Sequence, residues 1–181
     1  MGAQPPRLAC DATPAFWGGW AWDKADIKKN ARYPRFIVGF AEAALEVRKA
    51  RTSEDIARAV ALDEAHLGSN ERADYIKAVA ETGGLRVAVL RDGVQAFCCL
   101  DHGYFFEKPF VSLLVVSVDA RRRGLGAGLL THVSTAFSEV WTSTNRSNAA
   151  MRKLLDKAGW RYCGEVNGLD EGDPERFYKT G

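Results

Sequence analysis

Hydrophobic and polar residues follow short, regular patterns from residue 45 to the end of the chain. A period of two predicts β-strands, and a period near 3.6 predicts helices. Residues 125–138 show the helical period most clearly, with Leu125, Leu129 and Val133 on one face. Residues 110–118 form an almost unbroken apolar run, which is typical of a central strand buried on both faces. Further strands are predicted at residues 45–50, 85–91, 94–102, 139–144, 160–166 and 176–180, and further helices at 53–66, 71–80 and 148–158.

Polar residues at the ends of these segments predict how the chain turns. Ser53 and Ser147 stand where helix N-caps are expected, because a serine hydroxyl can accept a hydrogen bond from a free backbone amide. Asp92-Gly93 separates two predicted strands and favours a tight primed turn with positive φ at both positions. The order of the elements predicts a layered α/β domain.

The first 44 residues have a different character. They hold four of the six prolines and an aromatic cluster of Phe16, Trp17, Trp20 and Trp22, without a sustained period. We expect an irregular Trp/Pro-rich extension over residues 1–44, with short helices at 25–30 and 37–44, followed by one domain over residues 45–181. Exposed indole surface is unfavourable in water. The extension should therefore pack against the domain or a second subunit, which is consistent with a homodimer.

Composition narrows the classes of partner. The net charge is +2 and charged residues are spread along the sequence, so no basic stripe for a nucleic acid is expected. Cys10, Cys98, Cys99 and Cys163 lack the paired spacing of zinc or redox sites, which predicts reduced thiols and no metal. The sequence predicts neither a signal peptide nor a membrane span. We expect a cytoplasmic protein with no nucleic-acid or membrane partner.

The candidate chemistry lies between residues 118 and 128. A predicted strand ends at Val118, three arginines and a glycine-rich turn follow, and a helix begins. Free amides at the positive end of a helix dipole bind phosphate oxygens, and glycines let those oxygens approach the backbone. The glycine spacing matches neither the dinucleotide fingerprint nor a P-loop. On this segment alone, a phosphate site and a purely structural turn both remain open.

Two motifs occur in a defined order. Arg121, Gly124 and Gly126 follow a hydrophobic strand in the register RxxGxG, and Asn148 opens a predicted helix that ends in a Gly-Trp pair. Together these motifs resemble those of the GNAT acetyltransferase superfamily, in which Gln or Arg is followed by xxGxG or xxGxA. The resemblance covers residues 45–180, about three quarters of the chain.

The resemblance implies a GNAT-type α/β fold, with a mixed, mostly antiparallel central sheet, a splayed strand pair at the CoA site and helices on both faces. It implies acetyl-CoA as cosubstrate, with the thioester near Val116, whose backbone N–H would stabilise the oxyanion. The amides of Arg122, Gly124, Gly126 and Ala127 would take the pyrophosphate. The whole implied CoA-binding set is Val116, Ser117, Val118, Arg121, Arg122, Arg123, Gly124, Leu125, Gly126, Ala127, Gly128, Asn148 and Leu155.

One residue departs from the family pattern. Leu155 stands where the family often has a Tyr that protonates the departing thiolate. Either another group is the acid or the thiolate leaves unaided, which a thiol pKa near 8.5 permits. Three functions stay open. We favour acetyl transfer to a primary amine by direct attack in a ternary complex. The alternatives are non-catalytic acyl-CoA binding and a structural interaction domain that uses the Trp-rich extension.

An amine must lose a proton before it attacks, so a base is expected. The predicted catalytic residues are Val116 at the oxyanion, Tyr178 as candidate acid and Glu107 as candidate base, with Asp101 and His102 as further candidates. A late loop also carries four carboxylates, Asp170, Glu171, Asp173 and Glu175. These are either solvated turn residues or a rim that attracts a cationic amine. The expected acceptor is a small-molecule amine.

Overall fold

The computed structural model describes residues 44–181, so the predictions for residues 1–43 lie outside the described residues. Every strand and helix predicted from residue 45 onward is present, with ends that differ by a few residues. The elements are β1 (Glu46–Lys49), α1 (Ser53–Leu67), α2 (Ala73–Glu81), β2 (Leu85–Leu90), β3 (Gly93–Phe105), β4 (Lys108–Val116), a 3₁₀ helix (Val118–Ala120), α3 (Leu125–Ala136), β5 (Trp141–Asn145), α4 (Ala149–Lys157), β6 (Arg161–Val166) and β7 (Glu175–Lys179).

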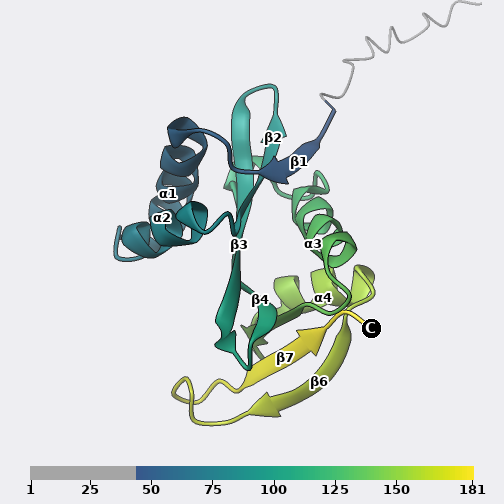
Figure 1. The fold of residues 1–181 in the computed structure, drawn as a ribbon. Coiled ribbons are helices and arrows are strands. Elements are labelled where there is room, and N and C mark those ends of the chain that lie inside the picture. Colours follow the sequence, from purple (N-terminus) through teal and green to yellow (C-terminus); the bar gives the residue numbers. More distant parts are fainter. Residues whose placement is uncertain (1–43) are drawn as a thin grey trace, which may run out of the picture. The chain divides into compact units, whose positions relative to one another are not determined.

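The strands form one seven-stranded sheet in the order β1-β2-β3-β4-β5-β7-β6 (Figure 1). Neighbouring strands are antiparallel except β4 and β5, which run parallel. Helices α1 and α2 cover one face of the sheet, and α3 and α4 cover the other (Figure 1). This arrangement confirms the predicted mixed, mostly antiparallel sheet with helices on both faces.

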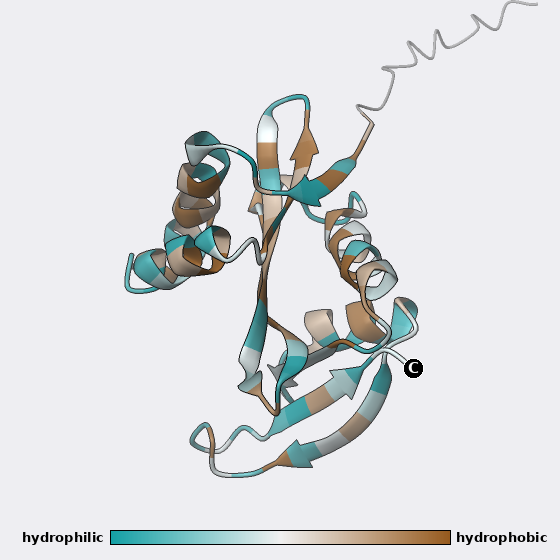
Figure 2. Ribbon diagram, viewed as in Figure 1, coloured by the Kyte–Doolittle hydropathy of each residue, from teal (hydrophilic) through white to brown (hydrophobic). Residues whose placement is uncertain are grey.

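Each face of the sheet has its own apolar core, because successive side chains on a strand point to opposite faces. Phe97 and Cys99 of β3 pack with α1 and α2, whereas Cys98 and Leu100 pack with α3. In Figure 2, hydrophobic residues lie along the central strands and alternate with polar residues on the helices. Cys98 and Cys99 are free thiols on opposite faces, and burial raises the pKa of Cys98 to about 12.

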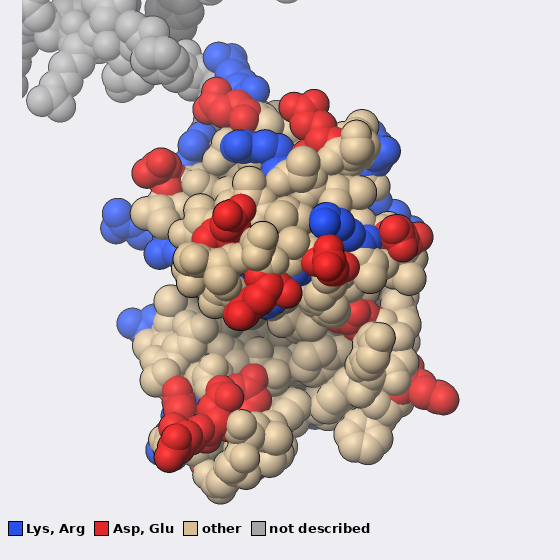
Figure 3. All heavy atoms as spheres, turned by 90° about the vertical axis from the view of Figure 1, so that its left-hand side faces the viewer, with Lys and Arg blue, Asp and Glu red and all other residues tan. Residues whose placement is uncertain are grey.

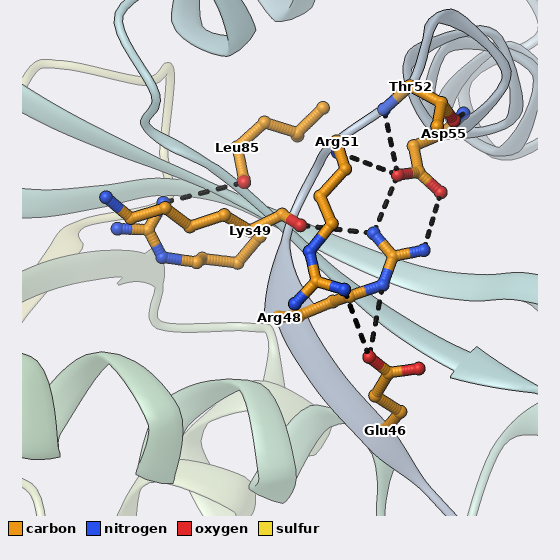
Figure 4. Close-up of polar contacts among 8 residues, drawn as sticks. Glu46, Arg48, Lys49, Arg51, Thr52, Asp55 and Leu85 are labelled. Atoms are coloured by element: carbon orange, nitrogen blue, oxygen red, sulfur yellow. Dashed lines mark hydrogen bonds and ion pairs between the residues drawn. The ribbon is translucent and has the colours of Figure 1, made fainter.

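A capping box and an ion pair fix the start of α1 (Figure 4). The N-cap is Thr52, whose Oγ1 accepts the N–H of Asp55 at 3.1 Å, while Asp55 accepts the N–H of Thr52 at 3.3 Å. Arg48 of β1 donates to both Asp55 oxygens at 2.7 and 3.0 Å, and this hydrogen bonding is the main reason that the pKa of Asp55 falls to about 2. The predicted cap, Ser53, was wrong by one residue, because only a cap at Thr52 places a carboxylate at the third helical position.

The β2–β3 hairpin differs from its prediction. Leu90 pairs with Gly93, so the turn residues are Arg91 and Asp92, and Gly93 already belongs to β3. Gly93 has a φ of 91°, whereas Asp92 does not have a positive φ. Glycine adopts this left-handed conformation without strain, so Gly93 can pair with Leu90 directly after the turn. The predicted primed turn at Asp92-Gly93 was therefore wrong.

The predicted central strand is central but only partly buried. Val111 and Val115 are buried in β4, but Ser112 is exposed. Val118 lies beyond the strand, in the 3₁₀ helix, and is 70% exposed. The prediction of burial on both faces was wrong because one edge of β4 loses its neighbour, as described below. No helix within residues 44–181 combines the length and the apolar character that a membrane crossing requires.

Candidate active site

Strands β4 and β5 separate soon after they meet. They pair only at Phe110–Trp141 and Val111–Thr142, where the Thr142 hydroxyl also donates to the Val111 carbonyl at 2.8 Å. After Val111, β4 continues to Val116 without a strand on this side. The result is the predicted splayed strand pair, which leaves one edge of β4 open.

The direction of the β4 peptide groups decides what this open edge offers. The Ser117 N–H donates to the Gln95 carbonyl at 2.9 Å, across the junction with β3. Antiparallel pairing alternates between hydrogen-bonded and non-hydrogen-bonded residues. The peptide groups of Leu114 and Val116 therefore point away from β3, into the gap. The peptide group of Val116 faces the gap, and its predicted role stays a prediction, whereas the Ser117 N–H is already bonded and cannot serve as a CoA donor.

The turn after β4 exposes a run of unpaired amides. Arg122 and Gly124 have positive φ values of 63° and 87°, and α3 begins at Leu125. Among residues 44–181, no hydrogen-bond acceptor is recorded for the N–H groups of residues 122–127. The first bond of the helix runs from the Gly128 N–H to the Gly124 carbonyl at 2.8 Å, so Gly128 is not a free donor. These unpaired amides lie at the positive end of the α3 dipole.

The side chains around this turn have different roles. Three exposed guanidinium groups add positive charge around the turn, and these are the side chains of Arg121, Arg122 and Arg123. The Leu125 side chain is buried in the α3 core. Gly128 packs against β1, because an added Cβ would lie 3.0 Å from Leu45 Cδ2. Only part of the predicted CoA-binding set therefore presents groups to a ligand.

Gly126 faces the interior of the site. An added Cβ would lie 3.0 Å from Leu154 Cδ2, 3.6 Å from Leu114 Cδ2 and 3.7 Å from Val116 Cγ2. The absence of a side chain therefore lets the first turn of α3 approach both α4 and the open edge of β4. Through this contact, the free amides of the turn adjoin the free peptide groups of the strand.

Helix α4 contributes one polar group and one core residue. Asn148, not the predicted Ser147, caps this helix, because its Oδ1 accepts the Met151 N–H at 3.1 Å. The two side-chain N–H groups of Asn148 have no acceptor in the described part of the chain. Leu155 is fully buried among core residues, so its side chain reaches no open surface and is not placed to contact CoA.

A second polar group lies on the α1/α2 face, beside the same gap. Tyr75 of α2 donates a hydrogen bond to Asp101 Oδ2 of β3 and shares another with the Ser112 hydroxyl of β4. The Ser112 hydroxyl also donates to the Cys99 carbonyl at 3.3 Å. Burial, followed by the bond to Asp101, raises the pKa of Tyr75 well above its usual range. Sequence reasoning named Asp101 but missed Tyr75 and Ser112, because no local pattern relates α2 to β4.

Comparison with known proteins agrees with this geometry. No protein-family model and no curated protein sequence matches the chain. Among solved structures, an acetyltransferase of the GNAT family from Bacillus cereus is 32% identical, with a TM-score of 0.71 over 76% of this chain and 96% of that chain. This chain belongs to the GNAT family of acetyltransferases.

More distant structures share the GNAT fold. A protein from Desulfovibrio desulfuricans assigned to the GNAT family is 18% identical, with a TM-score of 0.64 over 75% of this chain and 98% of that one. Arabidopsis thaliana NAA60, in complex with a bisubstrate analogue, is 15% identical, with a TM-score of 0.61 over 75% of this chain and 97% of that one. At these identities the similarity is one of fold.

The structure places the other two predicted catalytic residues in different surroundings. Glu107 is exposed in the β3–β4 turn, and the nine-residue strand β4 lies between it and Val116, about 30 Å at the usual rise per residue. The structure therefore does not bring Glu107 to the site. Tyr178 lies on β7 opposite Thr142 and is 3% exposed, in the same core as Leu155. Its role as an acid stays a prediction.

Two carboxylates of the acidic loop between β6 and β7 have a structural role. Asp173 accepts hydrogen bonds from the backbone N–H and the hydroxyl of Ser147, and Asp170 accepts one from the Asn145 side chain. The bonds from Ser147 lower the pKa of Asp173. With Arg146, residues 167–174 line an open pocket of about 630 Å³. These bonds hold the loop at the end of β5, which is the strand across the gap from β4.

Proposed function

We propose that this chain is an acetyl-CoA-dependent N-acetyltransferase that moves an acetyl group to a primary amine of a small molecule, by direct attack in a ternary complex. The observation that carries the proposal is the run of unpaired amides at the start of α3, next to the open edge of β4. Family membership supports acetyl transfer, and the geometry of the gap supports a thioester carried on a long, extended arm.

The chain's own groups match the parts of acetyl-CoA. The amides of Arg122, Gly124, Gly126 and Ala127 would hold the pyrophosphate at the helix dipole, with nearby arginines adding charge. The peptide groups of β4 would bond the pantetheine arm as an added strand does. The side-chain amide of Asn148 has two free donors for the same arm.

The open edge also supplies the electrostatics of the transfer. Backbone N–H groups at Val116 and Leu114 point into the gap and would polarise the thioester carbonyl, so that the oxyanion is stabilised as the amine attacks. Collapse of the tetrahedral species breaks the C–S bond. Because a thiol has a pKa near 8.5, the thiolate is a fair leaving group without a dedicated acid.

The same departure at Leu155 motivates a second candidate, a non-catalytic acyl-CoA-binding module, since the buried leucine cannot donate a proton. The two candidates differ in one measurable property, which is turnover. Both predict that CoA raises the midpoint of thermal unfolding, because a ligand that binds only the folded state stabilises it.

The test combines CoA binding with thiol release. The protein is titrated with CoA by calorimetry and then incubated with acetyl-CoA and a panel of primary amines while free thiol is followed. An enzyme gives thiol release that depends on the amine and yields the acetylated product by mass spectrometry. Binding without turnover on any amine supports the module instead, and no CoA binding at all rejects both.

A further inference from the structure

We propose that Asp101 takes the proton from the acceptor ammonium, and that Tyr75 and Ser112 position it. This inference rests on the proposed function and assigns the acceptor side of the same gap. It identifies the acceptor as an alkylamine that is protonated in solution and whose apolar part lies against the α1/α2 face of the sheet.

The location of the cluster is the first argument. Ser112 is an extra residue in β4, because Leu113 pairs with Cys99 while Val111 pairs with Leu100. Such a bulge re-aims a side chain, and here it turns the Ser112 hydroxyl towards Tyr75. The bulge comes directly after the last residue of β4 that pairs with β5. The cluster therefore lies at the closed end of the gap, where the two strands begin to separate.

Distance along the strand is compatible with proton transfer. Ser112 precedes Leu114 by two positions, about 7 Å at the rise of a strand. The peptide group of Leu114 points into the gap. An amine held between these residues is within reach of Asp101, directly or through one water, as general-base catalysis requires.

The state of the Asp101 carboxylate is the second argument. Asp101 is 8% exposed, and the Tyr75 hydroxyl donates a hydrogen bond to its Oδ2. Within residues 44–181, no group donates a hydrogen bond to Oδ1. This oxygen is nevertheless not fully enclosed by the protein. One oxygen is thus anchored and the other is open to solvent. Because the pKa of Tyr75 is raised, its hydroxyl stays protonated and serves as a donor, not as the base.

Few other charged groups face the cluster. Asp63 of α1 is buried and is held by Arg72 at the start of α2, with Oδ1 2.8 Å and Oδ2 3.0 Å from guanidinium nitrogens. Cys99 of β3 is buried beside Asp101, and burial foremost raises the pKa of its thiol. The neighbouring His102 packs its ring against Phe137 at 5.2 Å. Asp101 is therefore the one carboxylate among these groups that is not held by a cation.

The surface next to Asp101 suits an amine with an apolar body. Phe110 is directly opposite Asp101 on β4 and pairs on its other side with Trp141. Phe105 packs against both rings and against Phe177 of β7, at centroid distances of 4.8 to 5.5 Å. Figure 3 views this face and shows a hollow below the helices, flanked by acidic side chains at the level of the β6–β7 loop.

The proposed step balances as follows. Asp101 accepts one proton from the ammonium, and the freed lone pair forms the C–N bond at the thioester carbonyl. The C–S bond then breaks with its electron pair on sulfur, and the sulfur takes the extra proton from the new amide nitrogen. Asp101 returns its proton to solvent, so the products are the acetamide, the thiol and one proton.

The test compares Asp101→Asn and Tyr75→Phe with Asp74→Asn, an exposed carboxylate on the same helix as Tyr75. Asp101→Asn should lower kcat by about 100- to 1,000-fold and remove the acidic limb of the pH profile, with the Kd of CoA unchanged by calorimetry. Tyr75→Phe should lower kcat about tenfold. Its defect should also shrink as the acceptor amine becomes less basic, because Tyr75 acts only through the base. Asp74→Asn should match the wild type in all three readouts.

Acceptor basicity gives a second readout that a merely structural role would not move. The defect of Asp101→Asn should shrink along a series of amines of falling pKa, because a neutral amine needs no base. The inference is overturned if Asp101→Asn or folded Tyr75→Phe keeps the wild-type kcat and pH profile, or if the defect is equal for all amines. If the wild type neither binds CoA nor acetylates any amine, the proposed function itself fails.

Discussion

The two sides of the gap between β4 and β5 use different parts of the chain. On the side of α3, the groups presented are backbone amides, while the buried Leu125 side chain and the missing side chain of Gly126 matter mainly for packing. On the side of α2, they are the side chains of Tyr75, Asp101 and Ser112, from three separate elements. On the proposed function, the backbone groups bind CoA, which is the same for every acceptor. The side chains select the amine.

This difference has a consequence for substitutions. Variants on the α3 side should change CoA affinity and leave the dependence on amine and pH intact. Variants on the α2 side should do the reverse. Variants that support either side only through folding should change stability and neither kinetic property.

Gly126→Val should have the largest effect. The added side chain starts from a Cβ that lies 3.0 Å from Leu154 Cδ2, and its branches would meet Val116 and Leu114. We expect the Kd of CoA to rise about 100-fold, or ~3 kcal/mol, because the turn moves away from the edge of β4. Overpacking should also lower the free energy of unfolding by about 1–3 kcal/mol.

Gly126→Ala is the matched control for this change. Its single Cβ meets the flexible end of Leu154, so its effects should be smaller in the same direction. Calorimetry with CoA and urea unfolding measure the two quantities. A folded Gly126→Val variant with the wild-type Kd would show that the free amides are not the CoA site.

Asp55→Asn should have the next largest effect, on stability alone. The pKa of Asp55 is about 2 in the folded protein against its ordinary value of 3.8, a difference worth about 2 kcal/mol. Because the folded pKa is the lower one, this stabilisation is present above pH ~4 and is lost as the pH falls towards ~2.

Urea unfolding at a series of pH values measures this effect. Wild type and Asp55→Asn should differ by about 2 kcal/mol at neutral pH, and the difference should shrink between pH ~4 and pH ~2. The Kd of CoA and the pH profile of turnover should not change in Asp55→Asn. A difference that is constant with pH would mean that the Arg48 pair does not carry the stabilisation.

Local signals in the sequence predict the backbone site well. The turn, its glycines and the start of α3 lie within one short segment, so the pattern of residues 118–128 contained most of what the site needs. The cap of α1 was also encoded, since Thr52 followed by Asp55 at the third position is a capping-box signature. A cap at Ser53 would have Ile56 at the third helical position, and no carboxylate could reach back to it.

The side-chain site could not be derived in the same way. Tyr75 is 26 residues from Asp101 and 37 from Ser112, and their contact depends on an unpaired residue in β4. The sequence of an apolar run such as 110–118 does not reveal where a bulge forms. The candidate base Glu107 had the right chemistry and lay near the right strand. It lies at the wrong end of that strand, because register along β4 decides which residues reach the gap.

Leu155→Tyr is the smallest expected effect and the sharpest question about the backbone side. It supplies the hydroxyl that the family often has at this position, but Leu155 is fully buried beside Trp160 and Tyr178. A larger ring with a polar atom in this core should cost about 1–2 kcal/mol of unfolding free energy. We expect no gain in kcat, because a thiolate is a fair leaving group even without an acid. Turnover across pH and urea unfolding check both statements, with Leu155→Phe as control for ring size. A folded Leu155→Tyr variant that turns over faster than both wild type and Leu155→Phe would mean that leaving-group protonation limits the reaction. In that case, the lack of a proton-donating side chain on the α3 side would limit the rate of turnover.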